Sequence, residues 1–158
     1  MADTATAAFL QGLELAVIGW YAPAALVIGS PAAVRATSAF VAHHRNHARA
    51  FAALAGDAAL SAAPAAVTDA LGPLSPLASE DDAVAFLHGL ESRLAATQQF
   101  LLGGLLTVPA ISLTAATLPV ECQHTAVLGG LLSLPLAETV PAVQGTTGHL
   151  TAADYPIP

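Results

Sequence analysis

The chain has 158 residues, of which 55% are hydrophobic and only 9% charged, and four basic against eleven acidic residues give a formal net charge of −7. This acidic balance excludes nucleic-acid-binding proteins, which need a cationic surface to displace counterions, and proteins that attach to anionic membranes. The length is sufficient for one domain with a substantial core, and we expect residues 1–158 to form it.

Two long uncharged stretches, residues 15–34 and 94–120, raise the question of membrane spans. Prolines interrupt both stretches, and much of their apolar content is alanine, which contributes little to insertion. We therefore interpret them as helices buried in a globular protein and expect no membrane partner. The N-terminus lacks a basic segment followed by an apolar one, so no secretory signal is predicted and a cytoplasmic location is the default.

The first half of the chain predicts two helices joined by a short turn. Residues 4–28 form the first helix, which a Gly-Ser-Pro sequence ends, and Pro23 is expected to kink it. Residues 31–54 form the second helix, with Pro31 suited to its first turn and Gly56 to its C-terminal cap. The turn between these helices is so short that they must be antiparallel neighbours.

The second half repeats this arrangement after a long connection. Residues 56–79 contain several prolines, serines and aspartates, with at most two helical turns near residues 65–71, and are long enough to cross the whole molecule. A serine N-cap then starts a helix over residues 79–106, and a further helix covers residues 109–133. The remaining residues, 134–158, are predicted to form an extended strap.

An internal repeat with an offset of 77 residues connects the two halves. In each half, a lone glutamate on one predicted helix is followed 30 and 33 residues later by two candidate ligands on the next helix. Residues three apart share one face of a helix, so each such pair can point at one place. This is the ligand pattern of dinuclear metal sites in four-helix bundles. The predicted metal ligands are Glu14, His44 and His47 in the first half and Glu91, Glu121 and His124 in the second.

The predicted ligand set is three carboxylates and three imidazoles. Carboxylates can bridge two metals, and mixed oxygen and nitrogen ligands suit iron, manganese and zinc. The predicted cofactors are therefore two divalent metal ions, with iron or manganese favoured and zinc as the alternative. His43 competes with His44 because it lies one helical turn before His47. The 77-residue register favours His44, and the choice between the two stays open.

Several segments resemble bacterial ferritin-like domain proteins, the group that includes desiccation-related proteins and many actinobacterial members. The segments Phe40–Phe51 and Leu118–Leu128 resemble the second and fourth helices of that family, Leu13-Glu14 and Leu90-Glu91 its first and third helices, and Ala153–Pro156 its tail. The resemblance covers nearly the whole chain. It implies an all-α, ferritin-like four-helix bundle with one long crossover between the second and third helices, and a di-iron or di-manganese carboxylate centre.

The chain departs from the family pattern at two positions. The wider pattern has Glu-x-x-His twice, but His44 stands where the first of these glutamates is expected, and one bridging carboxylate is lost. Tyr21 is matched in the repeat by Gln98, so we expect these positions to differ in role. The resemblance implies an oxidoreductase of ferroxidase or catalase type, whereas the missing carboxylate favours zinc or a mononuclear site. The alternative function is non-catalytic metal binding, stress protection or a structural bundle. The apolar composition favours a homodimer or higher homo-oligomer.

Overall fold

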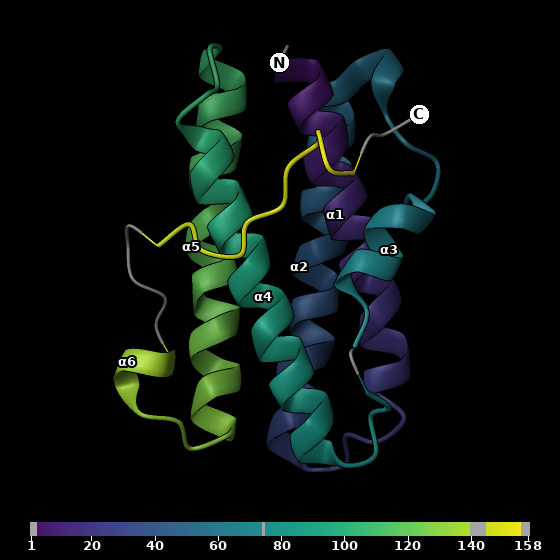
Figure 1. Cartoon of the computed structure of the whole chain (residues 1–158), viewed down its shortest axis with the longest axis vertical. Helices are drawn as coiled ribbons and strands as arrows, with labels where there is room; N and C mark the ends of the chain where they lie inside the picture. The colour runs from purple at the N-terminus through teal and green to yellow at the C-terminus, as the bar shows by residue number, and fades with distance from the viewer. Residues whose placement is uncertain (1–2, 74, 140–144, 156–158) are drawn as a thin grey trace.

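A computed structural model describes residues 3–73, 75–139 and 145–155, and within these ranges the chain is helical and has no β-strand (Figure 1). The predicted all-α class is therefore confirmed for this part of the chain. In chain order the elements are α1 (Asp3–Ala24), α2 (Pro31–Ala55), the 3-10 turn η1 (Gly56–Ala58), α3 (Ala65–Leu71), α4 (Glu80–Leu102), α5 (Val108–Leu131) and α6 (Leu136–Thr139).

The four long helices form two antiparallel pairs, α1 with α2 and α4 with α5. Figure 1 shows that α1 and α5 run in one direction and that α2 and α4 run in the other. The connection through η1 and α3 leads from the end of α2 to the opposite end of the molecule, where α4 begins. Because this connection crosses the length of the molecule, α2 and α4 are parallel.

Local sequence signals explain where α2 and α4 begin and where α2 ends. Ser30 and Ser79 cap the two helices, since each side-chain oxygen accepts a hydrogen bond from the backbone N–H three residues further on. Gly56 follows the last residue of α2 with a φ of 59°, a conformation that glycine adopts without steric cost.

Two long helices end earlier than their sequences suggest. α1 ends at Ala24 rather than near residue 28, one residue after Pro23, and residues 25–27 form a turn. α4 ends at Leu102 rather than near residue 106, where Gly103 and Gly104 follow with low helix propensity. α5 continues through its internal proline without interruption.

The first residues of α1 and α4 connect the two helix pairs in the same way. Asp3 accepts hydrogen bonds from the backbone N–H groups of Leu106 and Thr107, just before α5, at 3.2 and 2.6 Å. Glu80 accepts hydrogen bonds from the N–H groups of the two residues just before α2, at 2.7 and 2.8 Å. Each residue of the first contact corresponds to a residue of the second at an offset of 77 positions. Because each half thus contacts the other in the same way, the halves are related by an approximate twofold rotation.

The hydrophobic core lies between the long helices and extends beneath the connections. Phe9, Leu13, Phe51 and Leu87 are among its fully buried side chains. α3 packs on α1, where the Trp20 indole N–H donates a hydrogen bond to a backbone oxygen of α3 at 2.9 Å. None of the helices within the described ranges combines the length and the apolar content that crossing a bilayer requires.

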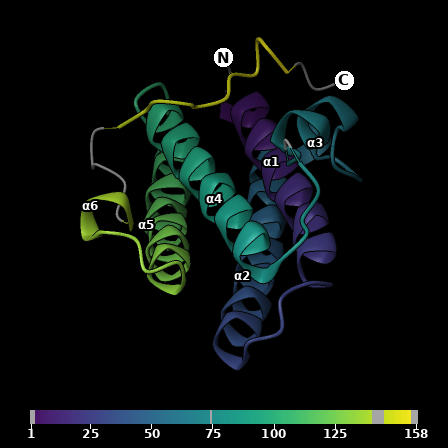
Figure 2. The same ribbon diagram turned by 60° about the horizontal axis from the view of Figure 1, so that its bottom comes forward.

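The C-terminal segment crosses α4 and reaches α1 (Figure 2). Leu150 is buried in the core, and its N–H donates a hydrogen bond to Thr97 Oγ1 at 2.9 Å. The predicted extended strap is interrupted by one helical turn, α6. Residues 140–144 and 156–158, with the last residue of the family-like Ala153–Pro156 motif, lie outside the described residues.

Candidate metal centre

Six polar side chains converge in the space between the four long helices. α1 and α4 each contribute one glutamate, and α2 and α5 each contribute a pair at i and i+3. Five of the six residues are at most 1% exposed, and the sixth, His47, has a side chain that is 12% exposed. The structure thus brings together all the residues of the repeat: Glu14, His44, His47, Glu91, Glu121 and His124. That they bind metal stays a prediction.

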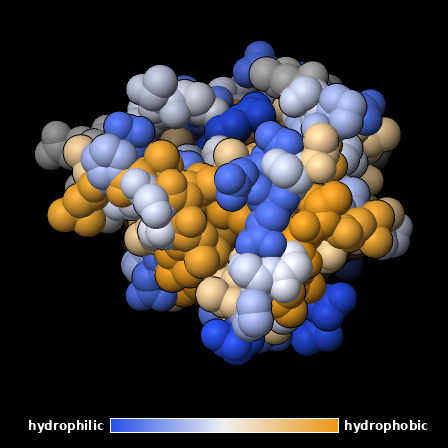
Figure 3. All heavy atoms as spheres, turned by 90° about the horizontal axis from the view of Figure 1, so that it is seen from below, coloured by the Kyte–Doolittle hydropathy of each residue, from blue (hydrophilic) through white to orange (hydrophobic). Residues whose placement is uncertain are grey.

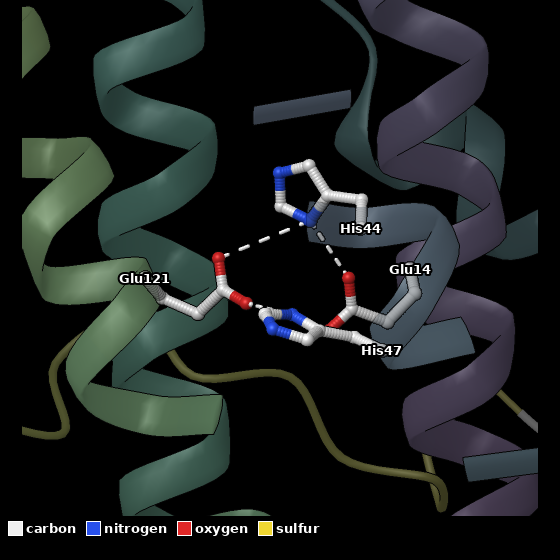
Figure 4. Close-up of side chains that lie close together, drawn as sticks. All are labelled: Glu14, His44, His47 and Glu121. Carbon is white, nitrogen blue, oxygen red and sulfur yellow. Dashed lines mark hydrogen bonds and ion pairs between the residues drawn. The ribbon is translucent and has the colours of Figure 1, made fainter. Parts of the chain in front are cut away.

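A first group of potential ligands comprises Glu14, His44, His47 and Glu121 (Figure 4), with one ligand atom of each within 4.8 Å of the others. His44 Nδ1 lies 2.7 Å from Glu14 Oε2 and 3.9 Å from Glu121 Oε2. His47 Nδ1 lies 2.8 Å from Glu121 Oε1 and 3.5 Å from Glu14 Oε1. Because ligand bonds are about 2.0–2.2 Å long, small side-chain shifts would bring all four residues to one ion.

A second group comprises His44, Glu91, Glu121 and His124, and it shares two residues with the first. His44 Nε2 lies 2.9 Å from Glu91 Oε1, so the ring faces Glu14 with one nitrogen and Glu91 with the other. His124 Nδ1 lies 3.2 Å from Glu91 Oε2 and 3.3 Å from Glu121 Oε2. The shared residues, His44 and Glu121, are positioned where ligands common to two ions would lie.

Further polar side chains orient the two lone glutamates. The Tyr21 hydroxyl of α1 donates a hydrogen bond to Glu91 Oε1 of α4, and the Gln98 amide of α4 donates one to Glu14 Oε1 of α1 at 3.3 Å. The Thr117 hydroxyl donates to Gln98 Oε1 at 2.8 Å and so holds the amide nitrogen toward Glu14. Tyr21 and Gln98 are 77 positions apart. We expected the two residues to differ in role. This expectation is wrong in one respect, because each side chain holds the glutamate of the other half in place.

His43 lies outside both groups but contacts the second. Its Nδ1 lies 2.9 Å from His124 Nε2, and the two rings are stacked with 5.2 Å between their centroids. This contact uses the His124 nitrogen that faces away from the glutamates, so it can fix the orientation of the ring. The geometric groups contain His44 and not His43, as the register of the repeat favours.

The three carboxylates differ in pKa although all are buried. Burial acts to raise the pKa of Glu14, but the hydrogen bond with His44 and the positive charges of His44 and His47 outweigh it and lower the value. The pKa of Glu91 is also lowered against the effect of burial, by two neighbouring imidazoles. The pKa of Glu121 is raised, because burial and the negative charge of Glu14 outweigh the attraction of its imidazoles. Glu121 is therefore the carboxylate whose charge is least compensated.

The surrounding carboxylates favour the cationic form of all three imidazoles. Burial acts to lower their pKa values, but the carboxylates outweigh it: the pKa of His44 is raised well above its ordinary 6.5, that of His47 is raised to about 9, and that of His124 is also raised. The geometry of His44 agrees, because a ring whose two nitrogens both contact carboxylates must carry a proton on each. The cluster is thus a network of buried ion pairs when its histidines are protonated.

Three buried atoms of the cluster have no hydrogen bond within the described structure, namely both carboxylate oxygens of Glu121 and Nδ1 of His47. His47 Nδ1 and Glu121 Oε1 are 2.8 Å apart, but they are not aligned as donor and acceptor. Unsatisfied buried polar atoms cost about 1–3 kcal/mol each and are rare. Because a cation between these residues would satisfy all three atoms, the cluster fits a metal ion, and its oxygen and nitrogen donors suit iron, manganese or zinc.

A cavity of about 250 Å³ lies beside the centre, between α1 and α2. Its lining consists of Tyr21, Ala25, Thr37, Ser38, Val41 and Arg45. Tyr21 both lines this cavity and donates a hydrogen bond from its hydroxyl to Glu91. A small molecule in the cavity would therefore be separated from the second ligand group by one side chain.

Comparisons with models of protein families, with curated proteins and with solved structures find no match to this chain. These comparisons therefore assign the chain to no family. Support for metal chemistry comes from the two ligand groups and from the unsatisfied atoms of Glu121 and His47.

Proposed function

We propose that this protein is a ferritin-like metal-binding protein whose buried carboxylates and imidazoles hold two divalent ions. The observation that carries this proposal is the pair of four-residue ligand groups that share His44 and Glu121. The order of the long helices, two antiparallel pairs joined by one long crossover, supports a ferritin-like four-helix bundle. The approximate twofold relation between the halves supports two equivalent ion positions.

Each ion would have two residues of its own, and His44 and Glu121 are the candidates to bridge the two ions. Glu14 and His47 would serve the first ion, and Glu91 and His124 the second. Three carboxylates supply a charge of −3 against the +4 of two divalent ions, so neutrality needs one more negative charge. Iron and manganese accept such mixed oxygen and nitrogen ligands, and zinc is the alternative.

Catalysis by such a centre would be of ferroxidase or catalase type. Bound iron or manganese would supply electron transfer with oxygen or peroxide, or oxidation of Fe(II) as substrate. The chain itself would keep the ligands in a closed space, with Tyr21 and Gln98 holding the lone glutamates in place. The cavity at Tyr21 is large enough for oxygen or peroxide and brings such a molecule close to the second ligand group.

Metal binding without turnover, for stress protection or for a structural role, is the second candidate. His44 favours it, because an imidazole at this position replaces a carboxylate of the Glu-x-x-His pattern and reduces the negative charge around the ions. A less negative set of ligands stabilises the higher oxidation states of iron and manganese more weakly. A ligand set that is richer in imidazole suits zinc.

Self-association into a homodimer or higher homo-oligomer is part of the proposal. Large apolar side chains are exposed, among them Leu26 at 86% and Leu136 at 78%. Figure 3 shows apolar side chains gathered in broad areas on one end of the molecule. A second copy of the chain could bury such areas. The net charge of −7 supports the absence of nucleic acid among the partners.

Oxygen consumption after addition of Fe(II) to metal-free protein separates the two candidates. A redox centre should consume oxygen well above the rate of free Fe(II), and Glu121→Ala should remove this activity. His149→Gln is a matched control, since His149 stacks on Phe100 and belongs to neither ligand group. Oxygen uptake that is equal in the native protein and in Glu121→Ala would rule out the redox function.

A further inference from the structure

His44 occupies the middle of the candidate metal centre and is fully buried. Its Nδ1 lies 2.7 Å from Glu14 Oε2, and its Nε2 lies 2.9 Å from Glu91 Oε1. Glu14 and Glu91 each belong to only one of the two ligand groups, whereas His44 belongs to both. From this geometry we propose that His44 bridges the two ions of the proposed centre as an imidazolate, binding one ion through Nδ1 and the other through Nε2.

The charge of the centre supports this bridge, which rests on the proposed two-ion function. Two divalent ions bring +4, and the three carboxylates bring −3. An imidazole that binds a metal through each nitrogen carries −1, which completes neutrality without an added anion. Each ion replaces one N–H proton of the cationic ring, so two protons pass from His44 to the solvent and no electron is transferred. His44 would thus supply the charge that Glu121 supplies at the matching position of the repeat.

The bridging residue determines how far apart the two ions lie. Metal–nitrogen bonds are about 2.0–2.1 Å long, and the two nitrogens of His44 point away from each other, so ions joined through this ring lie about 6 Å apart. Ions that share a carboxylate in two-metal sites lie about 3.5–4 Å apart. Glu121 is the competing bridge, because its Oε1 lies 2.8 Å from His47 Nδ1 and its Oε2 lies 3.3 Å from His124 Nδ1. The ion separation therefore distinguishes the two arrangements.

Crystals of the zinc-loaded protein test the bridge without an activity assay. Anomalous diffraction should show two zinc ions about 6 Å apart, on either side of the His44 ring. Two ions about 3.5–4 Å apart, or His44 bound to only one of them, would overturn the bridge and leave the metal-binding function intact. A single ion per chain would overturn the bridge in the same way. A protein that binds no zinc, manganese or iron would overturn both proposals.

Two variants of His44 extend the test to solution. His44→Gln cannot join two ions, and we expect its zinc content to fall from two ions per chain to one. His44→Glu restores a carboxylate, and X-ray absorption should then detect a zinc–zinc distance of about 3.5–4 Å that the native protein lacks. Circular dichroism checks the fold of both, and His149→Gln should retain two ions at the native separation. Two zinc ions in folded His44→Gln, or the short distance in the native protein, would contradict the bridge.

Discussion

The two halves of the molecule place equivalent residues at equivalent positions, yet they differ in charge. In the α1–α2 half one glutamate accompanies two histidines, whereas in the α4–α5 half two glutamates accompany one histidine. The difference comes from a single position of the repeat, where His44 corresponds to Glu121. Neither half balances its own charge, and His44 and His47 each contact a glutamate of the other half. The cluster therefore depends on the docking of the two helix pairs.

The largest expected effect is a difference in stability between variants of the two glutamates of the α4–α5 half. Glu91 accepts a hydrogen bond from Tyr21 and has a lowered pKa, whereas Glu121 has unsatisfied oxygens and a raised pKa. Glu91→Gln should destabilise the metal-free protein by about 3–5 kcal/mol, the cost of breaking a buried ion pair. Glu121→Gln should cost about 1 kcal/mol or less, because burial already opposes its charge. Urea unfolding measures both values, and equal losses would contradict this difference.

The pH dependence of stability tests whether the carboxylates and imidazoles pair across the halves. Raised imidazole pKa values mean that their stabilisation is full below pH 6.5 and is lost as the pH rises through the folded values, about 9 for His47. The lowered pKa values of Glu14 and Glu91 contribute above pH 4.5, their ordinary value, and are lost as the pH falls through the still lower folded values. Metal-free protein should therefore melt at a higher temperature near pH 6 than near pH 9.

A metal-loaded sample provides the control for this pH series. Bound ions replace the imidazole protons, so the loss of stability toward pH 9 should disappear after loading. Metal-free protein that is more stable near pH 9 than near pH 6 would contradict the assignment of cationic imidazoles.

A smaller effect compares Tyr21 with Gln98, the equivalent residues that orient the lone glutamates. Tyr21→Phe should destabilise the metal-free protein by about 1.5–3 kcal/mol, the range for a hydrogen bond to a charged group. Gln98→Met should cost about 1 kcal/mol, because its bond to Glu14 is long at 3.3 Å. Each variant should weaken metal binding about tenfold, measured by calorimetry, since each ligand loses an orienting partner. A greater loss in Gln98→Met would reverse the expected order.

The smallest expected effect concerns the equivalent N-caps, Ser30 of α2 and Thr107 of α5. Ser30 Oγ accepts a 3.4 Å hydrogen bond from the Ala33 N–H, whereas the Thr107 side chain makes no such bond to its helix. Ser30→Ala should therefore cost about 0.5–1 kcal/mol in urea unfolding. The Thr107 hydroxyl instead donates a hydrogen bond to Asp3 Oδ2 at 2.6 Å, so the comparison is made in an Asp3→Ala background. There Thr107→Ala should cost less than Ser30→Ala, and a larger loss would contradict the capping difference.

The repeat was sufficient to identify the residues that meet in the centre, because register within a helix is a local property. Glu14 with His44 and His47, and their counterparts 77 positions later, share faces of helices whose spacing the sequence displays. The all-α class agrees with the helices that the apolar stretches, caps and prolines of the sequence predict. That the six residues bind metal, and that the fold is ferritin-like, remain proposals.

Contacts between the halves could not be predicted, because they depend on how two helix pairs are placed in space. The hydrogen bonds from Tyr21 to Glu91 and from Gln98 to Glu14 join residues 70 and 84 positions apart. The register connects Tyr21 with Gln98, but only the fold shows that each reaches across to the other half. The early end of α1 was also missed, because the effect of Pro23 on the last turn depends on tertiary packing.

The most direct test of the central claim is a count of metal ions per chain by elemental mass spectrometry, on native protein and on Glu121→Ala, after reconstitution with Fe(II), Mn(II) and Zn(II). Glu121 belongs to both ligand groups, so the proposed centre predicts about two ions in the native chain and their loss in the variant. A native chain that retains none of these ions would contradict the metal centre and leave a network of buried ion pairs.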